Sequence, residues 1–474
     1  MEVLDFHTAL STPLPPASSE ERQVLHCEPY SDSAMSHLPV EMLGEIFQLA
    51  MDGDFGLAEC DVLDVKHSPN WVISHVCRAW RSVALSMPNL WTSVCIEDGS
   101  NLLMLDDVPF TDDRATLLQE YLARSGQCPL RVTLSSYDIQ KHLEILLPHF
   151  DRCADLSFTI DDEALITLST ISSEFPILER LTIVIDDISH YPSLPRNFSF
   201  SMPQIEGFSK APNLRVVSLR GIGILHLRLP FSQLRSFTGD ISNFLEYLEL
   251  FFLSSQLTTA ALNVRCIHPS FTLPVPFSHT RLHTLSLHTD LRCMEDLRLP
   301  ALEVFRIEHI SSNGGYYHIA KVFQDSHCPL HCLYLEIPAL RWSKLEPILK
   351  ACSSTLTSLS VRVDASSAWY VYNALTLDGP SCIVPRLEEL CLRDDTRPRW
   401  QDEYVEVSFA DDVFLDMVFW RRESEDEDKM MALKSLTMCA PYAPRPDDTL
   451  KELQELQEGG LKVGFHSHPW TKAI

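Results

Sequence analysis

A short pattern of leucines that recurs along most of the chain limits what this sequence can fold into. The pattern is Leu-x-x-Leu-x-Leu, in which other apolar residues can take the last two leucine positions. Strong copies begin at Leu178, Leu214, Leu282, Leu302, Leu330, Leu356, Leu387 and Leu433, and weaker copies begin at Leu234 and Leu257. Most copies begin 20 to 28 residues after the previous one, which is a spacing typical of repeat proteins.

The last two apolar positions of each copy alternate with polar residues, as a strand with one buried face requires. One such unit cannot bury its apolar face alone, so neighbouring units must stack into a solenoid. Between the strands, the stretch 341–354 has the apolar spacing of a helix. Near the end, Asp447 or Asp448 would cap a helix with Leu450, Leu453 and Leu456 facing inward, before a Gly-Gly stop and a last strand. The sequence therefore predicts an α/β solenoid of stacked parallel strands with helices on its outer side.

Composition narrows the class of partner. The 474 residues include 65 acidic and 38 basic ones, for a net charge of -27, which repels phosphate backbones and anionic lipid. We therefore expect no nucleic-acid partner and no membrane partner. No apolar run approaches the roughly 20 residues needed to span a bilayer, and the first residues lack the pattern of a signal peptide. The 14 cysteines show no dense spacing, so we expect reduced thiols and a location in the cytoplasm, the nucleus or both.

The chain divides into three regions. Residues 1–35 are rich in Ser, Pro and Glu and are expected to form a disordered leader. Residues 36–96 form a helical block, and residues 97–474 form the repeat region. In the block, Leu43, Ile46, Phe47 and Ala50 predict the apolar face of a first helix. A second helix is expected to carry Val72, Val76, Trp80 and Val83, to stop at Pro88 and to lead into a strand after Trp91.

Two or three short helices cannot fill a core of their own, so some apolar surface of the block must meet a partner or the solenoid. We interpret the block as a docking module. At these residues it resembles the F-box, whose motif begins Leu-Pro-x-Glu and ends Val-Cys-Arg-x-Trp-Arg. The matching residues are Leu38, Pro39, Glu41, Leu43, Ile46 and Phe47, followed by Val76, Cys77, Arg78, Trp80 and Arg81.

The repeat region resembles irregular leucine-rich repeats, and the ending Pro88-Asn89-Leu90-Trp91 is similar to that of fungal, basidiomycete-like F-box proteins that carry such repeats. The asparagine that the repeat family places eight residues after the first leucine is absent. Aspartate occupies that position in four copies: Asp186, Asp290, Asp364 and Asp395. Because aspartate accepts but does not donate hydrogen bonds, we expect the curvature of the solenoid to be uneven.

The resemblance implies a substrate-recognition subunit of an SCF-type E3 ubiquitin ligase. Its F-box would bind a Skp-family adaptor, and through it cullin, while the repeats bind an unknown client protein. It implies adaptor contacts at Leu38, Pro39, Glu41, Leu43, Ile46, Phe47, Val76, Cys77 and Trp80. The alternative for several of them, and for Trp80 above all, is packing inside the block or against the first repeat. The connection 52–70 is longer than usual; it either hinders docking or, as we expect, bulges into solvent.

Motifs for catalysis are missing. The sequence has no Gly-rich phosphate loop, no GxSxG and no HExxH, so we expect no enzyme and no cofactor. His327, Cys328, His331 and Cys332 would not converge on a metal if Leu333 and Leu335 face the core, so no metal site is expected. The clustered cations Arg393, Arg397 and Arg399 are the one candidate for a phosphate-bearing client. A repeat scaffold that works outside ubiquitination remains the alternative function.

Overall fold

The computed structural model describes most of the repeat region and most of the block. The described residues are 38–52, 61–97, 111–135, 139–170, 174–185, 204–264, 276–289, 291–295, 297–310, 316–337, 340–363, 367–376, 383–394, 408–422, 431–439 and 447–466. The expected leader 1–35, the four aspartates at the asparagine position, and Arg397 and Arg399 lie outside the described residues.

A single parallel sheet runs through the described part of the chain. Its 14 strands follow one another in sequence order, so each strand between the two end strands β1 and β16 is hydrogen-bonded to the sheet strand before it and the sheet strand after it. The strands are β1 (Ser93–Glu97), β2 (Leu130–Ser135), β3 (Cys153–Ile160), β4 (Arg180–Ile185), β5 (Val216–Arg220), β6 (Ser236–Ile241), β7 (Thr259–Val264), β9 (Thr284–Thr289), β11 (Val304–Ile310), β12 (Cys332–Leu335), β13 (Ser358–Val363), β14 (Glu389–Asp394), β15 (Ser435–Cys439) and β16 (Lys462–His466). A separate pair joins β8 (Phe277–Ser278) to β10 (Leu297–Arg298).

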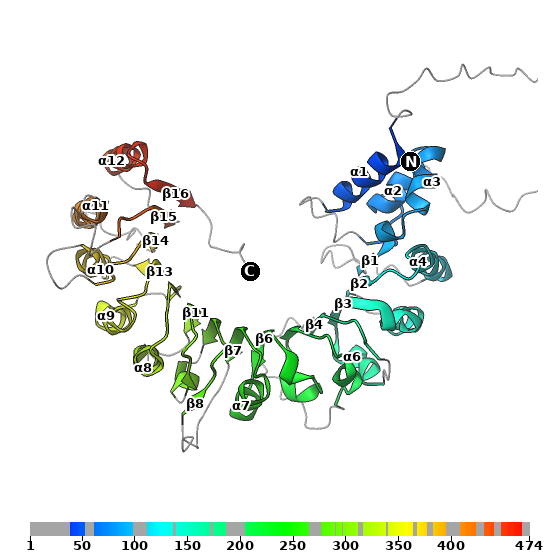
Figure 1. Cartoon of the computed structure of the whole chain (residues 1–474), viewed down its shortest axis with the longest axis horizontal. Coiled ribbons are helices and arrows are strands. Elements are labelled where there is room, and N and C mark those ends of the chain that lie inside the picture. Colours follow the sequence, from blue (N-terminus) through cyan, green and yellow to red (C-terminus); the bar gives the residue numbers. More distant parts are fainter. Residues whose placement is uncertain are drawn as a thin grey trace, which may run out of the picture.

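The molecule is an arc in which the sheet lines the inner, concave side and the helices of the repeats stand on the outer side (Figure 1). The α-helices are α1 (Val40–Asp52), α2 (Pro69–Val76), α3 (Arg78–Leu85), α4 (Asp112–Arg124), α5 (Ile139–Leu146), α6 (Asp162–Ser169), α7 (Phe244–Leu253), α8 (Tyr316–Ser326), α9 (Trp342–Ala351), α10 (Ala368–Leu375), α11 (Ser408–Arg422) and α12 (Asp447–Glu458). Short 3-10 helices are η4 (Pro88–Trp91), η5 (Leu147–Arg152), η6 (Gly207–Lys210), η7 (Ile224–His226), η8 (Phe231–Gln233) and η9 (Leu291–Met294). This is a mixed α/β architecture compatible with a repeat solenoid.

The register of the strands stacks the repeated apolar positions into continuous rows. Leu333 of β12 is paired with Phe305 of β11 on one side and with Leu359 of β13 on the other. All three are buried, while the residues between them in each strand point to the opposite, concave face. Each strand thus completes the burial of its neighbours, which is why the pattern must repeat to be stable. Removing one such leucine side chain costs about 2–5 kcal/mol in a packed core.

Every predicted copy of the leucine pattern coincides with a strand of the sheet. The first leucines of the ten copies are all buried, and β4 to β7, β9 and β11 to β15 follow them. The predicted helices at 341–354 and after Asp447 are α9 and α12, and the last strand is β16. Gly460, with φ of +97°, supplies the left-handed turn that ends α12. The sheet begins earlier than the pattern indicated, because β1, β2 and β3 also belong to it.

The prediction of one long helix from Val72 to Val83 is wrong. Two helices occupy this stretch, and Cys77 separates them with an extended backbone (φ −156°, ψ 172°). The Cys77 Sγ accepts a hydrogen bond from the Trp80 amide at 3.5 Å, so Cys77 caps the start of α3. A side-chain acceptor at this position satisfies an amide that the helix itself leaves unpaired. Pro88 does not simply stop a helix but begins the 3-10 helix η4.

Candidate functional site

The helices α1, α2 and α3 form the N-terminal end of the arc, next to β1 (Figure 1). Their buried side chains join the core of the first repeats and do not form a separate core. Trp71 of α2 packs edge-on against Trp91 of η4, with ring centroids 5.3 Å apart, and Trp91 packs in the same way against Tyr121 of α4 at 5.2 Å. The guanidinium of Arg124 lies 4.3 Å from the Trp71 centroid and 4.6 Å from that of Trp91. This cation–π contact adds to the apolar packing that fixes the block on the solenoid.

A buried polar contact crosses the same junction. The Asn70 amide nitrogen donates to the Leu90 carbonyl oxygen at 2.6 Å and to the Tyr121 hydroxyl at 2.5 Å. The Tyr121 hydroxyl in turn donates to the Ser93 carbonyl oxygen at 2.8 Å. Burial raises the pKa of Tyr121 above its usual range, so the hydroxyl stays protonated and remains a donor. These bonds tie α2, η4, β1 and α4 together at one point.

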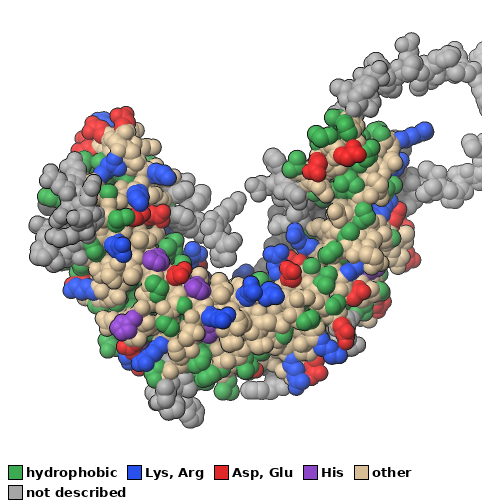
Figure 2. All heavy atoms as spheres, in the orientation of Figure 1, with side chains coloured by type: hydrophobic (Ala, Val, Ile, Leu, Met, Phe, Trp, Pro, Cys, Tyr) green, Lys and Arg blue, Asp and Glu red, His purple; other side chains and the backbone are tan. Residues whose placement is uncertain are grey.

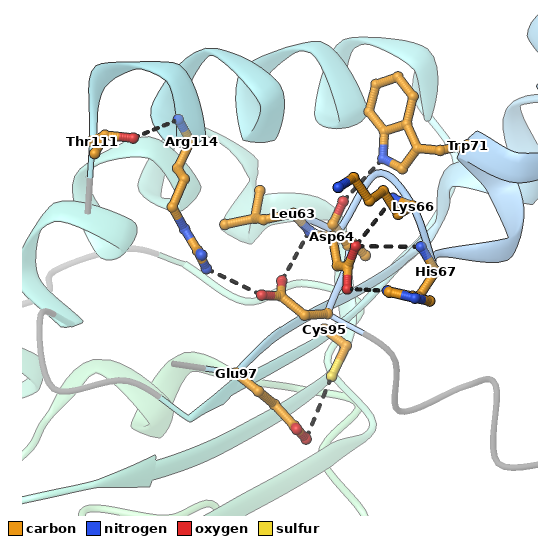
Figure 3. A network of polar contacts seen from close by, with 11 residues as sticks. Leu63, Asp64, Lys66, His67, Trp71, Cys95, Glu97, Thr111 and Arg114 are labelled. Carbon is orange, nitrogen blue, oxygen red and sulfur yellow. Dashed lines mark hydrogen bonds and ion pairs between the residues drawn. The ribbon is translucent and has the colours of Figure 1, made fainter. Parts of the chain in front are cut away.

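The insert between the two motif halves is partly buried where the structure describes it. The Val62 amide donates to the Cys95 carbonyl oxygen of β1 at 2.8 Å, and the Trp71 indole donates to the Val62 carbonyl oxygen at 2.9 Å (Figure 3). Asp61 forms an ion pair with Arg114 of α4 at 3.1 Å. Val62 and Leu63 are buried. Residues 61–63 are therefore held against β1 and α4, contrary to the expectation for this segment, whereas Lys66 and His67 are exposed.

Within this segment, Asp64 organises a tight turn (Figure 3). Its carboxylate accepts hydrogen bonds from the amides of Lys66 at 3.0 Å and His67 at 3.3 Å and contacts the His67 ring at 2.6 Å. Burial alone would raise the pKa of Asp64, but the bonds to His67 and Lys66 outweigh it and hold that pKa below its usual range. The charged carboxylate thus stabilises the turn that leads into α2.

The sequence-predicted adaptor residues fall into two groups. Four of them face inward, because Leu43 and Phe47 are buried and Leu38 and Trp80 are half-buried against the core. The rings of Phe47 and Trp80 lie 5.0 Å apart, so α1 packs on α3 through this pair. For these four residues the structure places the side chain in the packing of the block itself, which was the alternative considered for Trp80.

The other five predicted residues, Pro39, Glu41, Ile46, Val76 and Cys77, are exposed. Glu41 lies in the first turn of α1, where its charge stabilises the positive end of the helix dipole. Ile46 is exposed by 39% and Val76, at the end of α2, by 56%. Ala50, which was expected on the inner face of α1, is exposed as well. The helix α1 therefore has a second apolar stripe, which faces away from the core.

Sequence reasoning missed several side chains of that outer stripe. The exposed apolar residues of α1, α2 and α3 form what we call the end surface: Val40, Met42, Ile46, Leu49, Val72, Val76 and Leu85. Figure 2 shows hydrophobic side chains gathered at this end of the arc. Met42, Ile46 and Leu49 are spaced four and three residues apart, as are residues on one helix face. This second stripe lies beside the stripe of Leu43 and Phe47. The sequence contained a signal for it, because the apolar residues of the predicted helix fall on two of its faces.

The concave face of the sheet is a second candidate surface. Along its central row the strands from β2 to β9 present only small side chains: Thr133, Ser157, Thr182, Ser218, Thr238, Ala261 and Ser286. The row then changes to large ones at Arg306 and Tyr334, where the guanidinium lies 4.7 Å from the ring centroid. Beside them, Glu336 forms an ion pair with Arg393 at 3.4 Å. Basic side chains and histidines mark the inner rim of the arc (Figure 2).

The four residues His327, Cys328, His331 and Cys332 all lie within the described residues. Among the residues that the structure describes, no group of three or more His, Cys, Asp or Glu side chains is arranged to hold a metal ion. Burial raises the pKa of Cys328 to about 11, so this thiol stays protonated. The His331 ring instead contacts the Thr355 carbonyl oxygen at 3.2 Å. Within the same described ranges, no helix has both the length and the apolar character to cross a bilayer.

No model of a known protein family matches the sequence, and no curated protein is similar to it at a significant level.

Proposed function

We propose that the chain is the substrate-recognition subunit of an SCF-type E3 ubiquitin ligase. In this proposal the end surface binds a Skp-family adaptor, which links the chain to cullin, and the concave face binds a client protein. The observation that carries the proposal is the end surface itself, because seven large apolar side chains on three short helices are exposed, and Ile46 and Val76 among them are motif residues. Exposed apolar groups of this density mark an interaction site.

The arrangement favours a non-catalytic role. The inward residues Leu43, Phe47 and Trp80 set the angles between the helices, while Ile46, Leu49 and Val76 remain available to a partner. Aliphatic anchors in a small patch are what interface hot spots commonly contain. The concave face offers an aromatic ring, cations and anions over β11 to β14, which can distinguish one client from another through charge and shape.

The test is co-purification of the full chain with a Skp-family adaptor. The double variant Ile46→Asp, Val76→Asp places charges on the end surface, and we expect it to weaken binding by about thirtyfold or more, the cost of losing a hot spot. The matched control is Ile166→Asp, because Ile166 lies on α6 and is 51% exposed. Circular dichroism checks that each variant is folded. A wild-type chain that does not bind the adaptor contradicts the proposal.

A second function has its own support. The helices of the block and the segment 61–68 are bonded to β1 through Val62 and to α4 through Asn70, so the block can also serve as an N-terminal cap of a repeat scaffold that works outside ubiquitination. Solenoids need such caps to protect the apolar end of their core. This alternative predicts that the adaptor does not bind and that deletion of residues 38–92 lowers the stability of the repeats.

A further inference from the structure

Four arginines lie close to the strand starts along one stretch of the sheet. We call Arg131, Arg180, Arg215 and Arg235 the arginine rim, because each lies within two residues of the start of its strand, which is β2, β4, β5 or β6. All strands of this sheet are parallel, so their starts lie at the same edge. Figure 2 shows basic side chains along the inner rim of the arc. Since the net charge of the chain is -27, this local excess of cations is opposite in sign to the molecule as a whole.

The first half of the arginine rim already holds a carboxylate. The Asp155 carboxylate of β3 lies 3.2 Å from Arg180 and 3.8 Å from Arg131. These two arginines belong to the strands on either side of β3, so their backbones are separated by two strand spacings, or about 10 Å. Arginine side chains at this edge therefore reach a common carboxylate across that separation. The Asp155 contact shows, within the chain itself, how the arginine rim binds a carboxylate.

The second half of the arginine rim has no such carboxylate. The Arg235 amide donates to the Arg215 carbonyl oxygen at 2.8 Å, so the two residues lie on adjacent strands, about 4.8 Å apart. Neither guanidinium forms an ion pair or a hydrogen bond with any residue that the structure describes, and the same holds for the carboxylate of their neighbour Glu179. Like charges on adjacent strands repel each other. An anion from a partner would therefore be stabilised between Arg215 and Arg235.

The concave surface next to the arginine rim leaves space for an extended chain. In its central row, Thr182 of β4 is paired with Ser218 of β5, and Ser218 is paired with Thr238 of β6. These side chains are small, and their hydroxyls can donate or accept hydrogen bonds. From β2 to β6 there are four strand spacings, or roughly 19 Å, which is the length of about six residues of extended chain. A segment of that length reaches all four arginines.

We propose that the arginine rim binds an acidic segment of the client protein, extended over about six residues. Its Asp or Glu carboxylates contact Arg215 and Arg235, and further ones contact the donors that Asp155 leaves free on Arg131 and Arg180. Charge complementarity supports this occupant, because a neutral or basic segment gains nothing from four arginines. The inference rests on the proposed function, in which the concave face binds the client, and it adds the chemistry by which the client is recognised.

The experiment is fluorescence anisotropy of the full chain with hexa-L-glutamate, and with hexa-L-glutamine as the uncharged peptide that carries the same label. We expect hexaglutamate to bind about tenfold more tightly or better, which is the effect of one charge-assisted hydrogen bond. Raising NaCl from about 0.05 M to about 0.3 M should weaken this binding, because salt screens exposed charges. A glycine hexapeptide with one phosphoserine tests the other anion. Binding of this peptide without binding of hexaglutamate overturns the carboxylate assignment.

Two double variants locate the binding. Arg215→Gln with Arg235→Gln removes the unpaired cations, and we expect a loss of hexaglutamate affinity of about tenfold or more. The matched control is Arg228→Gln with Arg298→Gln, because these exposed arginines lie outside the 14-stranded sheet and carry the same charge. Its affinity should change by about twofold or less, since distant exposed charges are screened. Circular dichroism checks that both variants are folded.

Three outcomes overturn the inference: no binding of hexaglutamate at millimolar concentration, equal affinity for hexaglutamine, or equal losses in the two double variants. The titration contains no adaptor, so its failure is distinct from a failure of the proposed function. A chain that binds the adaptor but not hexaglutamate remains a receptor whose client is recognised in another way. A chain that binds hexaglutamate but not the adaptor keeps its acidic partner and works outside ubiquitination.

Discussion

The backbone amide of Val62 donates a 2.8 Å hydrogen bond to the carbonyl oxygen of Cys95. This bond places a segment from the middle of the helical block beside the first strand of the sheet. The neighbouring residue Leu63 is buried, and the indole of Trp71 donates a hydrogen bond to the Val62 carbonyl oxygen. The block and the solenoid therefore share one core and are not two bodies joined by a linker.

Hydrogen exchange tests this shared core. The Val62 amide is buried and bonded across the junction, so it exchanges only when the junction opens. The Lys66 amide, four residues later, bonds to the Asp64 side chain at an exposed position. We expect the Val62 amide to exchange about a hundredfold more slowly than the Lys66 amide. Equal rates for the two amides would show that the segment is not held on β1.

Tyr121→Phe tests the polar contact at the junction. The change removes the donor to the Ser93 carbonyl and the acceptor of the Asn70 amide, and both groups remain buried. We expect the free energy of unfolding to fall by about 1–3 kcal/mol in urea denaturation. Tyr317→Phe is the control, because Tyr317 is 73% exposed and its loss should change stability by at most about 0.5 kcal/mol. Similar losses in both variants would contradict this account.

Arg421→Met tests a buried cation near the other end of the arc. The Arg421 guanidinium donates to the carbonyl oxygens of Leu375 at 2.7 Å, Ile383 at 3.0 Å and Val384 at 3.2 Å. Val384 has φ of +56°, which is unfavourable for a β-branched residue, and these bonds help to hold it there. We expect a loss of about 3 kcal/mol or more, since three carbonyls lose a donor.

The measurement for Arg421→Met is again urea denaturation, with Arg341→Met as the control at an exposed position. The control should stay within about 0.5 kcal/mol of the wild type. If the Arg421→Met variant is more stable than the wild type, the cost of burying the guanidinium is larger than the stabilisation that its three hydrogen bonds provide.

His149 gives the stability a pH dependence of known sign. Burial and the nearby charge of Arg152 lower the pKa of His149, and the Arg152 guanidinium lies 3.3 Å from its Nδ1. Below the unfolded pKa of about 6.5, the unfolded chain binds a proton that the folded chain does not. Proton binding by His149 therefore does not lower the free energy of unfolding above that pH. As the pH falls through it, the unfolded chain takes up the proton and the free energy of unfolding decreases.

We expect His149→Gln to reduce the fall in the free energy of unfolding between about pH 7 and pH 5. Glutamine keeps an acceptor for Arg152 but cannot take up the proton. Urea denaturation at a series of pH values measures the slope for both proteins. A slope in His149→Gln that equals the wild-type slope would show that another group causes the acid sensitivity.

The strands of the repeats could be predicted because their signal is local. In the pattern around Leu333 and Leu359, alternation at period two marks a strand with one buried face, and both residues are buried in neighbouring strands. The helices α9 and α12 were predictable for the same reason, since their apolar spacing and end signals lie within one short segment. The strands β1 to β3 lack a clear copy of the pattern, although burial alternates along β2 and most of β3; in β1, three consecutive residues are buried.

The candidate site was predictable only in part. The motif located the block, but it did not separate Leu43 and Phe47, which pack inward, from Ile46 and Val76, which are exposed. Apolar character is the same on both sides of α1, so only the position of α3 decides which stripe is covered. The boundary at Cys77, which ends α2 and caps α3, was not predictable because no helix-breaking residue such as Gly or Pro marks it.

The amino-acid sequence by itself determined the repeating strands and the helices α9 and α12, because each depends on spacing along a single segment. The tertiary structure decided where residues 61–68 lie, which apolar side chains form the end surface, and that Arg131 and Arg180 share the carboxylate of Asp155. These features depend on contacts between segments far apart in the chain. No pattern of spacing within one segment specifies such contacts, since they follow from how the segments pack in three dimensions.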